Sequence, residues 1–133
     1  MKILVTGDGR VAKGALEILE YTNIKKISPE EYLINDDLTS VFCNLTTSKY
    51  VSNKEGKDFD LHHFINFPDH YSSELNKYMS NTDMIISSHY WDPKSPKLFE
   101  KKDLKLFKKL KVIGDITCDI NGSIPTTLRS STI

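Results

Sequence analysis

The chain has 133 residues, a size typical of one domain, and 38% of them are hydrophobic while 27% are charged. Eighteen basic and eighteen acidic side chains give a formal net charge of zero, which argues against a charge-driven partner such as nucleic acid or an anionic membrane. The apolar runs are far shorter than the roughly 20 residues of a membrane-spanning helix. We therefore expect a globular domain that binds neither nucleic acid nor membrane.

The cysteine and histidine residues give no sign of a metal site. Cys43 and Cys118 lie far apart in the sequence and form no metal-binding pair, so we expect reduced thiols in a cytoplasmic protein. His62 and His63 are adjacent, and no set of four ligands accompanies them. The sequence therefore predicts no bound metal.

The chain opens with a pattern of strand, glycine-rich turn and helix. Residues 2–6 form a short apolar run that stops at Gly7, as a buried parallel strand does. From Val11 onward the apolar residues fall at helical spacing. Residues 24–27 indicate a second strand, and the following Ser-Pro-Glu-Glu sequence is typical of a helix start, with Ser28 as the capping residue.

The middle of the chain is harder to interpret. We expect residues 41–51 to be extended and residues 59–67 to pair back on them as a hairpin. Residues 68–79 are expected to be helical, with Tyr71, Leu75 and Tyr78 on one face.

Toward the end of the chain the pattern becomes regular again. It predicts a strand over residues 84–88, an amphipathic helix over residues 99–110, a last strand over residues 111–115 and a polar loop over residues 116–133. Alternating strands and helices predict an α/β protein, a Rossmann-like doubly wound parallel sheet with helices on both faces. Ligands of such sheets bind beyond the carboxyl ends of the strands.

A motif that binds phosphate groups follows the first predicted strand. Residues 7–12 (GDGRVA) match the dinucleotide-binding pattern G-x-G-x-x-G/A between a strand and a helix. Gly7 permits the tight turn, Gly9 lets a diphosphate approach the backbone, and Ala12 lets the helix lie close to the strand. The motif predicts contacts to NAD or NADP from Gly7, Gly9, Arg10, Val11 and Ala12.

The acidic residue that usually binds the adenosine ribose is missing. Ser28 stands at the end of the second predicted strand, where its hydroxyl could bind the ribose with or without a 2′-phosphate. The choice between NAD and NADP therefore stays open, and Ser28 could equally be a helix cap and nothing more.

Further candidate residues follow the last two predicted strands. Tyr90 could pack its ring against the nicotinamide or a ribose. Asp115 and Asp119 could bind an amide, a ribose or a substrate ammonium group, although such carboxylates also cap loop amides.

The sequence resembles the Rossmann domain of the lysine-ketoglutarate reductase/saccharopine dehydrogenase (lysine-forming) family, which is related to alanine dehydrogenase and transhydrogenase. Four stretches carry the resemblance: residues 6–15 (TGDGRVAKGA), 27–31 (ISPEE), 67–91 and 115–124 (DITCDINGSI). It implies interconversion of saccharopine with lysine and 2-oxoglutarate by a nicotinamide cofactor.

The resemblance also implies roles for single residues. Gly9 and Arg10 would hold the diphosphate, and Ser28 would lie at the adenosine ribose. The nicotinamide half would be lined by Tyr90 and Ile116, and Asp119 would face the reacting end.

The family carries its catalytic Lys and His in a separate domain that precedes the Rossmann domain. We therefore expect residues 1–133 to be a single dinucleotide-binding domain of a larger two-domain enzyme, with its substrate domain supplied in cis or in trans. Three alternatives stay open: a free-standing nucleotide-binding regulatory module without catalysis, the cofactor domain of another amino-acid dehydrogenase such as alanine dehydrogenase, and a structural chain with a vestigial site.

Overall fold

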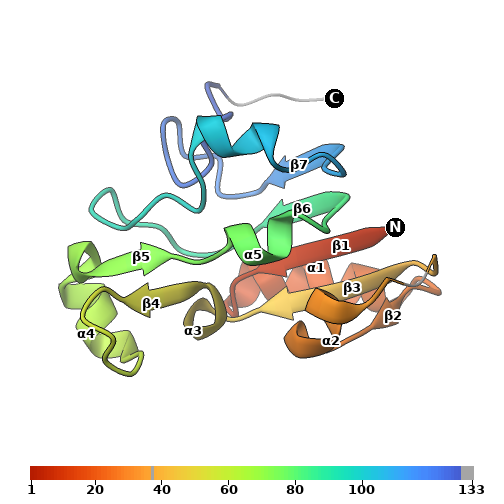
Figure 1. Cartoon of the computed structure of the whole chain (residues 1–133), viewed down its shortest axis with the longest axis horizontal. Coiled ribbons are helices and arrows are strands. Elements are labelled where there is room, and N and C mark those ends of the chain that lie inside the picture. The colour runs from red at the N-terminus through yellow and green to blue at the C-terminus, as the bar shows by residue number, and fades with distance from the viewer. Residues whose placement is uncertain (37, 130–133) are drawn as a thin grey trace.

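A five-stranded parallel sheet forms the centre of the computed structural model, which describes residues 1–36 and 38–129 (Figure 1). In chain order the elements are β1 (Lys2–Thr6), α1 (Arg10–Glu20), β2 (Lys25–Lys26), α2 (Pro29–Ile34), β3 (Val41–Leu45), α3 (Thr47–Tyr50), β4 (Val51–Asn53), α4 (Leu61–Asn66), the 3-10 helix η1 (Pro68–His70), β5 (Tyr71–Ser73), α5 (Asn76–Met79), β6 (Met84–Ser87), the 3-10 helix η2 (Lys101–Lys105) and β7 (Val112–Asp115).

The strands of the large sheet follow the order β2-β3-β1-β6-β7, so β1 lies at its centre. Every residue of β1 is buried, which explains why Ile3, Leu4 and Val5 are consecutive apolar residues rather than alternating with polar ones. The second strand of the chain, β2, pairs with β3 rather than with β1.

Side chains of the sheet alternate between two apolar clusters. Ile3 and Val5 face the cluster that includes Leu19 of α1. Leu4 faces the opposite cluster, to which α2 contributes Tyr32 and α5 contributes Met79. Figure 1 shows α1 behind the sheet and α2 and α5 in front of it. The predicted α/β, Rossmann-like sheet with helices on both faces is confirmed.

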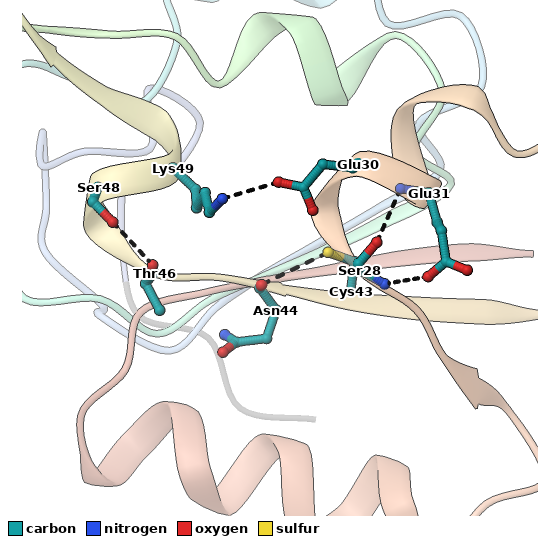
Figure 2. Close-up of polar contacts among 8 residues, drawn as sticks. All are labelled: Ser28, Glu30, Glu31, Cys43, Asn44, Thr46, Ser48 and Lys49. Atoms are coloured by element: carbon teal, nitrogen blue, oxygen red, sulfur yellow. Dashed lines mark hydrogen bonds and ion pairs between the residues drawn. The ribbon is translucent and has the colours of Figure 1, made fainter.

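The start of α2 has the structure that its sequence predicts. The side chain of Ser28 accepts a hydrogen bond from the amide of Glu31 (3.1 Å), and the Glu31 carboxylate accepts one from the amide of Ser28 (2.9 Å) (Figure 2). Pro29 occupies the first helical position. These reciprocal bonds satisfy two amides that the helix itself leaves without acceptors.

The predictions for the middle of the chain are wrong in three places. The extended stretch over residues 41–51 is interrupted by α3, which places Tyr50 in the core. Residues 59–67 do not form a hairpin strand, because Asp60 caps the helix α4 by accepting from the amide of His63 (2.7 Å). The antiparallel partner of β4 is instead β5, so residues 68–79 are not one helix.

The amphipathic helix predicted over residues 99–110 is also wrong, since only η2 forms there. Four apolar residues of this region still face the core: Phe99 and Phe107 are buried in it, and the partly buried Leu104 and Leu110 pack against it, whereas Leu106 is exposed. The region is therefore amphipathic as predicted, but its apolar spacing did not determine the hydrogen bonding of the backbone.

The segment after β7 consists of turns and bends over residues 116–129, as the sequence predicts, and residues 130–133 of that prediction lie outside the described residues. Within the described part of the chain, none of the helices has the length and apolar character needed to cross a membrane.

Candidate functional site

A pocket of about 490 Å³ lies beyond the carboxyl ends of β1, β6 and β7. This is where parallel α/β sheets bind their ligands. Three loops line the pocket, and they contribute Asp8, Gly9, Arg10 and Val11; Ser88, His89, Tyr90 and Trp91; and Ile116, Thr117 and Asp119.

The structure brings together most of the residues singled out from the sequence. The pocket is lined by Gly9, Arg10, Val11, Tyr90, Ile116 and Asp119. The other four do not line it: Gly7 and Ala12 are buried beneath the first loop, Asp115 ends β7, and Ser28 follows the edge strand β2. Which part of a cofactor each of these ten residues contacts stays a prediction.

Gly7 has a conformation that other residues rarely adopt, with φ at +104°. A Cβ atom on Gly7 would lie 2.8 Å from the carbonyl oxygen of Ser88 and 2.9 Å from the Cα of His89. The absence of a side chain therefore lets the first loop pass directly against the loop that follows β6.

Gly9 differs, because a Cβ atom at this position would meet no protein atom within 4 Å. Gly9 is the N-cap of α1, no side chain caps this helix end, and its first turn holds no acidic residue. The first amides of a helix lack acceptors within it and carry the positive end of its dipole. With open space at Gly9 and the pocket beside it, these residues fit a diphosphate group.

Asn44, on β3, holds the glycine loop in place and was missed by the sequence analysis. Its side-chain amide donates hydrogen bonds to the carbonyl oxygens of Gly7 (2.8 Å) and Val5 (3.3 Å). The only signal in the sequence is a polar residue inside an apolar strand, which gives no hint of the partner.

His89 is a second residue that was not predicted, although it lies in the segment expected beside the site. Its Nδ1 shares a hydrogen bond with the hydroxyl of Thr6 (2.9 Å), and its Nε2 shares one with the hydroxyl of Ser123 (3.0 Å). Burial lowers the pKa of His89 to about 4, against a smaller opposing effect of Asp115. The neutral imidazole therefore ties together the ends of β1 and β6 and the loop after β7.

Asp115 holds the loop that follows β7. Its carboxylate accepts hydrogen bonds from the amide (3.2 Å) and the hydroxyl (2.6 Å) of Thr117 and from the hydroxyl of Thr127. Within this loop Cys118 and Asn121 have positive φ angles of 56° and 57°. The hydrogen bonds to Asp115 thus fix the conformation of the loop whose Ile116, Thr117 and Asp119 line one wall of the pocket.

Metal ligands do not gather at the pocket. Over residues 1–36 and 38–129, no group of three or more His, Cys, Asp or Glu side chains is arranged to hold a metal ion.

Comparison with known proteins finds relatives that align with all or nearly all of the chain, although no protein-family model matches it. The chain is 32% identical to an alpha-aminoadipic semialdehyde synthase of Arabidopsis thaliana, over 96% of the chain and 14% of the plant protein. It is 26% and 25% identical to the mitochondrial alpha-aminoadipic semialdehyde synthases of Bos taurus and Mus musculus, over 100% of the chain and 17% of each relative.

The chain thus spans only about a sixth of the length of these relatives. The relatives agree with the resemblance seen in the sequence, and the parallel sheet agrees with a Rossmann-like domain. The chain is therefore a homologue of one segment of the alpha-aminoadipic semialdehyde synthases, in agreement with its resemblance to the lysine-ketoglutarate reductase/saccharopine dehydrogenase family.

Proposed function

We propose that this chain is the NAD(H)- or NADP(H)-binding domain of an oxidoreductase that interconverts saccharopine with lysine and 2-oxoglutarate. The observation that carries the proposal is the uncapped start of α1, where Gly9 leaves open space beside the pocket. The relatives support the reaction, and the strand–loop–helix geometry supports the cofactor class.

The start of α1 binds the diphosphate in this proposal. Its amides donate to the phosphate oxygens, and the exposed guanidinium of Arg10 adds a positive charge at the same end of the pocket. Asn44 and the backbone contact beneath Gly7 keep the loop in the shape that presents these amides.

The loops after β6 and β7 bind the nicotinamide half. Tyr90 is 83% exposed and Ile116 is 47% exposed, so both present apolar surface that a flat ring can cover. Asp119 offers a carboxylate at this end of the pocket. The bound cofactor supplies or accepts the hydride, while the residues of this chain orient it.

The groups that transfer protons come from a second domain in this proposal. The chain spans about a sixth of the length of its relatives, which leaves ample sequence in those proteins for a substrate domain. We expect residues 1–133 to bind cofactor alone and to require that domain, in cis or in trans, for turnover. The isolated chain should bind more weakly than micromolar, because in this proposal the second domain forms the other wall of the cleft.

Calorimetric titration with NADH and NADPH tests the site. Gly9→Val should abolish binding, because its side chain occupies the space of the diphosphate. Gly14→Val is the matched control, since Gly14 is also exposed and open around its Cβ but lies within α1, away from the pocket lining. Equal binding by Gly9→Val and the parent chain would show that the site is assigned wrongly.

A second assay tests the reaction. The chain mixed with the substrate domain of a relative should oxidise NADH or NADPH in the presence of lysine and 2-oxoglutarate, and neither part should do so alone. Cofactor binding without any activity in the mixture would favour a nucleotide-binding regulatory module instead.

A further inference from the structure

The order of strands changes which residues lie beside the glycine loop. In Rossmann sheets the adenosine ribose is contacted at the carboxyl end of the strand that neighbours the first strand on the side away from the nicotinamide. Here that neighbour is β3, whose Leu45 pairs with Thr6 of β1. Strand β2, with Ser28 after it, is separated from β1 by β3.

Two hydrogen bonds fix the end of β3 against the glycine loop. The amide of Gly7 donates to the carbonyl oxygen of Leu45 (2.9 Å), and the side chain of Asn44 donates to the carbonyl oxygen of Gly7 (2.8 Å). Thr46 is therefore the first residue beyond a strand end that is bonded to the loop. The segment from Thr46 to Lys49 leaves β3 on the side of β1 opposite to β6 and β7.

The side chains of this segment carry hydroxyl groups and one positive charge. The hydroxyls of Thr46 and Ser48 lie 3.3 Å apart, and the ammonium of Lys49 lies 2.9 Å from the carboxylate of Glu30 on α2 (Figure 2). The segment contains no acidic residue. The hydroxyl of Ser28, in contrast, is already engaged as the cap of α2.

We propose that Thr46, Ser48 and Lys49 contact the 2′ position of the adenosine ribose, in place of Ser28, and that Glu30 tunes the discrimination between a 2′-hydroxyl and a 2′-phosphate by competing for Lys49. This inference rests on the proposed function, since it concerns the same bound cofactor.

The Lys49–Glu30 pair is suited to such competition because it is exposed. The two side chains are 47% and 70% accessible, and exposed ion pairs of this kind are weak. A phosphate dianion offers Lys49 more charge and more acceptor oxygens than one carboxylate does. A 2′-hydroxyl offers no charge, so Lys49 stays with Glu30 when NADH is bound.

The first experiment introduces the same carboxylate at the two rival positions and measures Kd for NADPH and NADH by calorimetry. Thr46→Asp should raise the ratio of Kd for NADPH to Kd for NADH by roughly tenfold or more, because a carboxylate repels the 2′-phosphate and accepts from the 2′-hydroxyl. Ser28→Asp should leave the ratio unchanged, and it retains an acceptor for the α2 cap. Using the ratio cancels any effect on folding that is common to both titrations.

The second experiment changes the ion pair. Lys49→Gln should raise the same ratio roughly tenfold while Kd for NADH stays the same, and Glu30→Gln should lower it by about two- to threefold. Lys26→Gln is the matched control, because Lys26 forms a similarly exposed ion pair with Glu20 on the edge of the sheet. That control should leave the ratio unchanged.

The results separate the two proposals. If Ser28→Asp shifts the ratio and Thr46→Asp does not, or if Lys49→Gln acts no differently from Lys26→Gln, the inference is wrong while cofactor binding stands. If the unmodified chain binds neither nucleotide, the proposed function itself fails.

Discussion

The Nε2 atom of His89 lies 3.0 Å from the hydroxyl oxygen of Ser123, and this contact joins two loops that are separated by more than thirty residues of sequence. Both residues are buried, with His89 8% and Ser123 0% exposed. The shape of the pocket therefore depends on an imidazole that stays neutral at physiological pH.

Acid should destabilise the protein through His89. Its pKa falls from an ordinary value of 6.5 in the unfolded chain to about 4 in the folded one. The unfolded state thus binds the proton first, so stability from this group is complete above pH 6.5 and is lost as the pH falls toward 4. Between pH 7.5 and 5 the loss is about 2 kcal/mol.

Urea unfolding at the two pH values measures this loss. His89→Gln should unfold more easily at pH 7.5, yet its stability should change less between pH 7.5 and 5 than that of the parent. An equal pH dependence in both proteins would contradict the assignment.

Gly7→Ala should destabilise the fold strongly, because the new methyl group meets the backbone of Ser88 and His89 as well as adopting a positive φ. Gly56→Ala separates the two effects, since Gly56 has a φ of +74° but open space around it. We expect a cost of about 1 kcal/mol for Gly56→Ala and at least about 2 kcal/mol for Gly7→Ala. Equal shifts of the urea midpoint would show that the close approach to the second loop is unimportant.

Asn44→Asp should loosen the glycine loop while changing the size of the side chain very little. Its carboxylate would face the carbonyl oxygens of Val5 and Gly7, to which the amide now donates. We expect a loss of about 1–3 kcal/mol in thermal or urea unfolding at pH 7, together with weaker nucleotide binding. A variant as stable as the parent would mean that this amide does not hold the loop.

Lys2→Met should destabilise the end of α2 despite the apolar replacement. The Lys2 ammonium donates to the carbonyl oxygens of Tyr32 (2.6 Å) and Asn35 (2.8 Å), and it lies 4.4 Å from the centre of the Tyr32 ring. Burial lowers the pKa of Lys2, but these acceptors at a helix C-terminus favour the charged form. Losing both bonds should cost about 2 kcal/mol.

The exposed Lys25 on the edge strand β2 is the control for this change, and Lys25→Met should shift the urea midpoint very little. If the two variants unfold alike, the buried ammonium contributes nothing specific to α2.

The sequence by itself predicted the parallel strands, the first helix, the cap of α2 and the loops that line the pocket. These features follow from short stretches of sequence: Ile3, Leu4 and Val5 of β1 are consecutive apolar residues because both faces of the strand are buried, and the reciprocal hydrogen bonds of Ser28 and Glu31 span only four residues.

Only the tertiary structure decided which strand neighbours β1, how residues 46–79 and 99–110 fold, and what Asn44 and His89 contact. Short runs such as residues 71–73 contain too few residues for the spacing of apolar side chains to distinguish strand from helix. Antiparallel pairing with β4 is what makes these residues a strand. Hydrogen bonds between residues far apart in sequence leave no spacing pattern, because each side of the bond is a single polar residue. The physical reason for this difference is the range of the interactions. Contacts within one turn depend on residues that are close together in the sequence, whereas strand order and the walls of the pocket depend on packing across the whole sheet.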